Sequence, residues 1–215
     1  SMTTPRVLLA DDHTLVVEGF RRLLEDQCQL VGTVGDGRSL LDAIPQLKPD
    51  IVILDISMPV LNGIDAARVL RTKHPQIKIV FITMHADPAY VRAAFEAGAS
   101  AYLLKRCVGE ELAQAMRAVR SGNFYVTPLI TKEVVEGMLR GGDSASAMGP
   151  ELTTRQREVL QLLAEGHTVK DIAGKLRISP RTVEFHKGQI MEQLNLHSTV
   201  ELVKYAMAQG LTGQL

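Results

Sequence analysis

The sequence predicts two units of different fold class: an α/β unit over residues 5–122 and an all-α unit over residues 151–215. Short apolar runs alternate with segments of helical periodicity through the first unit. Turn-forming or polar residues close each apolar run, as at strand ends. In the second unit no strand pattern occurs, and closely spaced helix-capping residues take its place. A chain of 215 residues is long enough for two such domains.

The first unit alternates strand and helix five times. Strands are predicted at residues 6–10, 30–34, 51–54, 77–82 and 101–104. Helices that follow them are predicted at residues 15–24, 40–47, 62–73, 88–97 and 110–120. The third run, Ile-Val-Ile-Leu, is apolar at every position and is therefore expected to be buried on both faces of a parallel sheet. The pattern favours a flavodoxin-like (βα)5 fold with strand order 2-1-3-4-5.

Polar residues end four of these five strands. Asp11 and Asp12 follow the first strand, Asp55 the third, Thr83 the fourth and Lys105 the fifth. Because the carboxyl ends of parallel strands meet at one edge of the sheet, these side chains are expected to converge there. Each residue alone could be structural, but their joint placement favours a functional site.

Gathered carboxylates repel one another, and either a raised pKa or a bound cation relieves that repulsion. All-oxygen ligands with room for water favour Mg²⁺ over Ca²⁺. The predicted ligand set is Asp12 and Asp55 directly, Asp11 through water, and the backbone carbonyl of Ser57. Asp55 is predicted to be the nucleophile that accepts a phosphoryl group, with Lys105 and Thr83 binding the transferred oxygens.

A linker is predicted at residues 123–150, first helical over 131–140 and then flexible through the Gly- and Ser-rich residues 141–150. The second unit contains four helix starts. Their predicted caps are Thr153 with Gln156, Thr168 with Asp171, Ser179 before Pro180, and Ser198. Short helices joined by tight turns indicate a helix-turn-helix DNA-binding unit.

The helix after Ser179 has the position of a recognition helix. Val183, Ile190 and Leu194 fall on its predicted buried stripe, and the opposite face is available to base edges and phosphates. The candidate DNA-binding residues are Arg181, Thr182, Glu184, Phe185, Lys187 and Gly188. A solvated helix face with one exposed aromatic is the competing interpretation.

Two groups of motifs are similar to known families. Asp11-Asp12, Asp55 with Met58-Pro59, Thr83, and Tyr102 through Lys105 resemble the receiver domain of two-component response regulators. The resemblance implies Mg²⁺-dependent transfer of phosphate from a histidine kinase to Asp55 and slow self-dephosphorylation, without other enzyme activity. It also implies that Tyr102 is a switch residue that rotates inward. Ser57 and His85, each two residues beyond a site residue, are hypothesised to tune the lifetime of the acyl phosphate.

Residues 151–209 resemble the four-helix DNA-binding domain of LuxR- and NarL-type regulators. The motifs that carry this resemblance are Leu152-Thr153, Glu158-Val159-Leu160, Ile172-Ala173, Ile178-Ser179-Pro180, Thr182-Val183 and His186. Glu184 and Gly188 depart from the family pattern of basic or polar contacts, and the domain is nearly neutral, which weakens phosphate binding by a monomer. The resemblance implies a homodimer, with the last helix as its seam through Leu202, Tyr205 and Met207. Core packing against the other three helices is the competing use of these residues.

Together these features predict a phosphorylation-regulated transcriptional regulator. One alternative is a regulator that has weakened or lost DNA binding and acts through protein contacts, favoured by Glu184. A second alternative, a Mg²⁺-dependent phosphatase, lacks an acid/base residue beside Asp55. The formal net charge of +0 gives no sign of nucleic-acid or membrane binding, and Cys28 and Cys107 form no metal or disulfide pattern. Without an export signal or a long apolar run, a cytoplasmic location with no membrane partner is expected.

Overall fold

The computed structural model describes residues 4–139 and 152–211. Its sheet has the strand order β2-β1-β3-β4-β5-β6, and every neighbouring pair is parallel. The strands are β1 (Arg6–Ala10), β2 (Gln29–Val34), β3 (Ile51–Leu54), β4 (Lys78–Thr83), β5 (Ala101–Leu104) and β6 (Tyr125–Val126). The predicted (βα)5 fold and order 2-1-3-4-5 are confirmed, with β6 as an additional edge strand.

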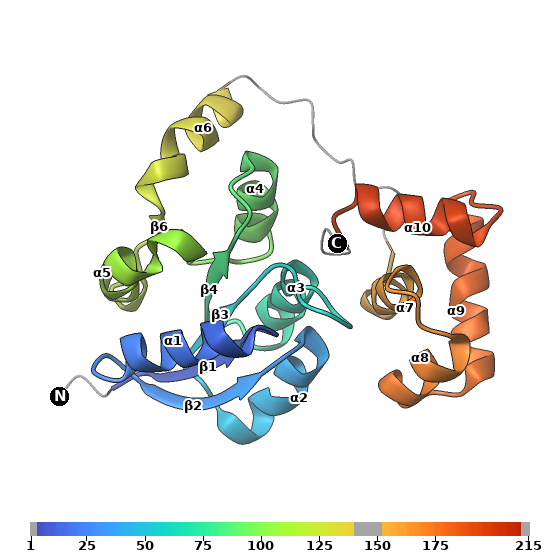
Figure 1. Ribbon diagram of the computed structural model, residues 1–215, viewed down its shortest axis with the longest axis horizontal. Helices are drawn as coiled ribbons and strands as arrows, with labels where there is room; N and C mark the ends of the chain where they lie inside the picture. The colour runs from blue at the N-terminus through green and yellow to red at the C-terminus, as the bar shows by residue number, and fades with distance from the viewer. Residues whose placement is uncertain (1–3, 140–151, 212–215) are drawn as a thin grey trace.

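Helices cover both faces of the sheet, as Figure 1 shows. Those of the first unit are α1 (Thr14–Leu24), α2 (Gly37–Leu47), α3 (Gly63–Lys73), α4 (Pro88–Glu96), α5 (Val108–Arg120) and α6 (Pro128–Leu139), with a short 3-10 turn, η1 (Lys105–Cys107), before α5. One core forms beneath α1 and α5, and a second core forms beneath α2, α3 and α4. The sheet therefore lies between two helical layers, which leaves the strand ends as its open edge.

Strand β3 lies at the centre of this arrangement. Its four residues are all buried and alternate between the two cores: Val52 and Leu54 pack on one side, Ile51 and Ile53 on the other. An aliphatic residue at every position is what a strand covered on both faces requires. Asp55 follows immediately, at the edge of the sheet.

The second unit is all helical, with α7 (Thr154–Ala164), α8 (Val169–Leu176), α9 (Pro180–Gln193) and α10 (Thr199–Ala208) around one core. Each predicted cap is present. Thr153 with Gln156 and Thr168 with Asp171 form reciprocal capping boxes, while Ser179 and Ser198 each accept a backbone N–H. Among the described helices, none combines the length and apolar composition that crossing a membrane requires.

The structure differs from the sequence prediction after residue 122. Strand β6 continues the sheet, and α6 begins at Pro128, three residues before the predicted helix start. Buried Ile130 and Val134 pack α6 onto the same core as α4. The predicted flexible segment, residues 141–150, lies outside the described residues, and the domain boundaries remain predictions. The two units touch where α7 meets the segment between β3 and α3 (Figure 1).

Candidate functional site

Two buried carboxylates and one lysine meet at the carboxyl edge of the sheet. Asp11 and Asp55 are 5% and 4% exposed. The Lys105 Nζ lies 2.8 Å from Asp11 Oδ2 and 2.7 Å from Asp55 Oδ2, so that one ammonium group bridges both carboxylates. The structure thus brings together residues from the ends of β1, β3 and β5, as the topology predicted.

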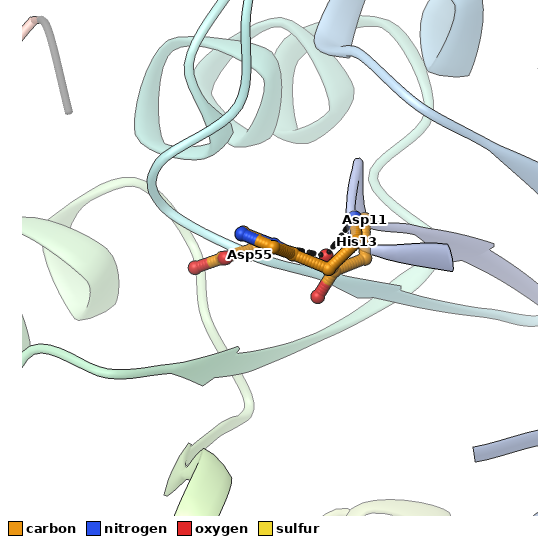
Figure 2. A group of neighbouring side chains, drawn as sticks. All are labelled: Asp11, His13 and Asp55. Atoms are coloured by element: carbon orange, nitrogen blue, oxygen red, sulfur yellow. Dashed lines mark hydrogen bonds and ion pairs between the residues drawn. The ribbon is translucent and has the colours of Figure 1, made fainter. Parts of the chain in front are cut away.

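His13 joins this group, and sequence reasoning had not selected it. Its Nδ1 lies 3.0 Å from Asp11 Oδ1 and 3.1 Å from Asp12 Oδ1. In Figure 2, Asp11, His13 and Asp55 lie close together, and their possible ligand atoms are within 4.8 Å of one another. Asp12 is the less buried acid, with a side chain 38% exposed. The first turn after β1 therefore offers an imidazole beside the predicted carboxylates.

A close approach of backbones holds the segment after Asp55. Gly63 begins α3, and a Cβ at this position would lie 2.0 Å from the carbonyl oxygen of Asp55. The Gly63 N–H donates to the Ile56 carbonyl at 2.8 Å, and the side chain of Asn62 caps the helix by accepting from the Asp65 N–H. Only glycine fits beside the Asp55 carbonyl, so the start of α3 is fixed against the acidic residue.

Thr83 and Tyr102 are fully buried beside the carboxylates. Thr83 accepts a hydrogen bond from the His85 N–H at 3.3 Å, and the Tyr102 hydroxyl donates to the His85 carbonyl at 2.7 Å. Thr83 and Lys105 also line a small open depression at this edge. The Tyr102 ring lies inward, the orientation that the resemblance associates with the switched form.

Ser57 and His85 contact each other directly. The Ser57 Oγ lies 2.7 Å from His85 Nε2, and the imidazole stacks on Tyr90 with ring centroids 4.3 Å apart. The Ser57 N–H also points toward Asp55 Oδ1 at 3.4 Å. These two side chains thus form one connected unit beside Asp55.

Burial and charge set the protonation of this edge. Burial lowers the pKa of the Lys105 ammonium, but its bonds to Asp11 and Asp55 raise the pKa by more, so that it stays charged. Burial also lowers the pKa of His85, which favours the neutral imidazole. For Tyr102, burial first and the nearby Asp55 charge second raise the pKa well above its ordinary value. The phenol therefore remains a hydrogen-bond donor at neutral pH.

The residues present fit a hard divalent cation. Two buried carboxylates converge on a single ammonium group, so the carboxylates outnumber the lysines at this edge. The surrounding donors are mainly oxygen atoms, the ligands that Mg²⁺ prefers. Asp11 and Asp55 lie in the group, and Asp12 is connected to it through His13.

Helix α9 places its two faces as the sequence predicted. Val183 and Ile190 are fully buried, whereas Phe185 is 62% exposed. Of the candidate DNA-binding residues, Arg181, Glu184, Phe185 and Gly188 are exposed, and Thr182 and Lys187 are partly exposed. The Thr182 hydroxyl lies 2.8 Å from Ser179 Oγ, at the helix cap. The structure thus presents an open helical face to a partner.

The fold and this site define the class of protein: a receiver-type α/β unit with an acidic site at its sheet edge, joined to a helix-turn-helix unit. The family model of the response regulator receiver domain matches residues 7–117, and that of bacterial regulatory proteins of the luxR family matches residues 150–206. The chain belongs to the two-component response regulators that carry a LuxR-type DNA-binding domain. Proteins of this family are transcriptional regulators rather than classical enzymes.

Similar proteins share this organisation over nearly their whole length. The oxygen regulatory protein NreC of Staphylococcus carnosus is 37% identical, over 96% of this chain and 98% of that protein. The transcriptional regulatory protein MctR of Rhizobium johnstonii is 32% identical, over 98% and 96%. RcsB from Salmonella enterica serovar Typhimurium, solved bound to promoter P1flhDC in the presence of the phosphomimetic BeF3⁻, is 29% identical with a TM-score of 0.60, over 94% of this chain and 98% of that one.

Proposed function

We propose that Asp55 accepts a phosphoryl group from a histidine kinase and that this event controls DNA binding by the second unit. The observation that carries the proposal is the largely buried Lys105 ammonium, whose side chain is 9% exposed and which bridges Asp11 and Asp55. A phosphoryl group on Asp55 brings added negative charge, which this ammonium can bind at the position where it develops. The carboxylate of Asp55 is itself the nucleophile.

Mg²⁺ would be held by Asp12, Asp55 and the Ser57 carbonyl, with Asp11 through water, and would neutralise the phosphoryl oxygens. The response regulator receivers to which this domain belongs generally use Mg²⁺. Lys105 binds a phosphoryl oxygen, and the Thr83 hydroxyl donates to another. Since Thr83 and Tyr102 both bond the backbone of His85, a change at Thr83 can reach Tyr102 through one residue. The same chemistry allows slow self-dephosphorylation by water.

The second unit acts on double-stranded DNA as a homodimer when Asp55 is phosphorylated. The exposed face of α9, with Arg181 and Phe185, enters the major groove. Exposed Met207 and partly exposed Tyr205 on α10 form the dimer seam, whereas Leu202 is fully buried in the core of the second unit. Two recognition helices double the phosphate contacts, which compensates for the weak basic character of a single domain.

The test is selection from a random-sequence DNA pool after treatment with acetyl phosphate and Mg²⁺. Wild-type protein, Asp55→Ala and the exposed control Asp26→Ala are treated identically, and the intact mass of each reports phosphorylation. If wild type and Asp26→Ala enrich specific sequences and Asp55→Ala does not, both halves of the proposal are supported. Equal enrichment by Asp55→Ala contradicts phosphorylation control, and no enrichment by any protein at several salt concentrations favours action through protein contacts instead.

A further inference from the structure

Gln161 of α7 lies buried in the contact between the two units, with 1% of its surface exposed. Its Oε1 accepts from the backbone N–H of Asn62 at 2.8 Å and from Asn62 Nδ2 at 3.2 Å. Its Nε2 donates to the Met58 carbonyl at 2.8 Å and to Glu165 Oε1 at 2.9 Å. One carboxamide of the DNA-binding unit thus bonds the backbone of the receiver on both sides of Val60.

Val60 holds an unfavourable backbone conformation between these two bonds. Its φ of 67° lies in the left-handed region, where a β-branched residue is strained. The Leu61 N–H donates to the Pro59 carbonyl at 2.8 Å and closes a tight turn around Val60. The Val60 N–H in turn donates to Glu165 Oε1 at 3.2 Å. Strained turns persist where their surroundings fix them, and here Gln161 and Glu165 are part of those surroundings.

The segment that α7 holds is the one that follows Asp55. Met58 is three residues beyond the phosphoacceptor, and the Ser57 N–H points toward Asp55 Oδ1. At the far end of the segment, Gly63 bonds back to the Ile56 carbonyl. Contacts that hold residues 58–62 in place therefore also limit the movement of the backbone at Asp55.

Contact of α7 with the receiver, here called docking of the second unit, does not cover the recognition helix α9. Phe185 on α9 and Val200 on α10 stay 62% and 63% exposed while α7 is docked. Tyr102 also lies inward in the same arrangement. Docking of the second unit is thus compatible both with an open DNA-binding face and with the inward position of the switch residue.

We propose that Gln161 is a positioning residue for phosphoryl acceptance: through its bonds to Met58 and Asn62, the docked DNA-binding unit orders the loop after Asp55 and speeds phosphorylation. The proposal rests on the proposed function of Asp55. Phosphoryl transfer depends on placement of the nucleophile more than on covalent chemistry by the protein, so loosening of this loop slows it.

The experiment uses the full chain and Gln161→Met, which keeps the side-chain volume but removes every bond to the loop. The matched control is Gln193→Met, at an exposed position on α9. Glu165→Ala is a second variant, which removes the bond to Val60. The measurements are the rate of Asp55 phosphorylation by acetyl phosphate over a range of Mg²⁺ concentrations, and amide hydrogen exchange of residues 58–62 without Mg²⁺.

For Gln161→Met we expect faster exchange in residues 58–62 and phosphorylation slower by about threefold to tenfold, the factor that the loss of ordinary hydrogen bonds gives. The Mg²⁺ concentration for half-maximal rate should rise, which a fraction of unfolded protein does not produce. Glu165→Ala should follow in the same direction, and Gln193→Met should match wild type. Unchanged or faster phosphorylation in both Gln161→Met and Glu165→Ala overturns the inference, whatever the exchange shows. Failure of wild type to acquire phosphate at Asp55 overturns the proposed function itself.

Discussion

At the residue scale, the contact between Ser57 and His85 gives the first prediction. The Ser57 Oγ and His85 Nε2 are 2.7 Å apart, so removal of either side chain breaks the same hydrogen bond. We expect Ser57→Ala and His85→Ala to change the decay rate of phosphorylated protein in the same direction and by a similar factor. The double variant should decay like the single variants, because residues in one hydrogen-bonded pair are not additive.

The measurement is the loss of label from Asp55 after removal of the phosphodonor. His74→Ala, an imidazole at the end of α3, serves as control. Independent, multiplicative effects of the two substitutions contradict a shared role, and unchanged decay in all three variants removes Ser57 and His85 from the reaction.

Tyr102 gives a prediction for alkaline stability. Its folded pKa is raised above the ordinary value of about 10, mainly by burial. Above pH of about 10 the unfolded chain releases the phenolic proton while the folded chain retains it, so unfolding becomes more favourable as pH rises. The stabilising contribution is complete below that pH and is lost above it. We expect Tyr102→Phe to lower the free energy of unfolding by about 1 kcal/mol at neutral pH, through the lost bond to His85, and to flatten the decline between pH 9 and about 11.

Urea unfolding at several pH values measures this slope. Tyr125→Phe is a useful comparison because the pKa of Tyr125 is also raised by burial, although this side chain is more exposed than Tyr102. An equally steep decline in Tyr102→Phe contradicts the assignment of the slope to this phenol.

The sequence predicted the centre of the site better than its periphery. Asp11, Asp55 and Lys105 could be placed together because parallel strands bring their carboxyl ends to one edge. His13 was missed because an imidazole just after a strand carries no periodic signal. The bond between Ser57 and His85 depends on the paths of two loops, which residue spacing does not determine.

At the element scale, one face of α9 packs in the core of the second unit and the opposite face is exposed. Ile190 is fully buried in the core of the second unit, whereas Phe185 is 62% exposed. We expect Ile190→Ala to cost about 2–5 kcal/mol of unfolding free energy. Phe185→Ala should leave stability within about 0.5 kcal/mol and weaken DNA binding. Thermal unfolding and DNA titration of the two variants measure the contrast, and normal DNA binding by Phe185→Ala contradicts a recognition role for this face.

Helix starts were predictable where a side chain caps them. Thr153, Thr168, Ser179 and Ser198 each satisfy backbone N–H groups that would otherwise lack partners, and that chemistry is local in sequence. Strand β6 was not predictable in the same way. Two residues are too few to show a period, and β6 forms because it pairs with β5, which is a tertiary contact.

At the scale of the whole molecule, the contact between units lay beyond sequence reasoning. Arg38 on α2 binds Glu158 on α7 across 120 residues of chain, and Arg157 on α7 lies 2.6 Å from Asp65 on α3. Each pair joins a cation of one unit to an anion of the other. Glu158 and Asp65 are nearly fully buried, and no local pattern indicates that an arginine of the other unit also binds each of them.

These ion pairs predict how the docked arrangement can be opened. Glu158 is fully buried and is bound by Arg38 and, at 3.0 Å, by Arg155 of its own helix. Arg38→Ala removes the only one of these two cations that comes from the other unit, so the cost of burying Glu158 is no longer offset across the contact. Separation of the units returns this carboxylate to water. We therefore expect Arg38→Ala to shift the molecule toward an extended form.

Small-angle X-ray scattering measures this shift as an increase in the radius of gyration, with Arg21→Ala on the exposed side of α1 as the matched control. Both units should keep their thermal stability, because Arg38 is partly exposed and lies outside both cores. In wild type, high salt should increase the radius of gyration only slightly, since buried ion pairs are screened less than exposed ones. A radius of gyration equal to that of wild type contradicts the prediction and means that the remaining contacts, including Arg157 with Asp65 and Gln161 with Asn62, suffice for docking.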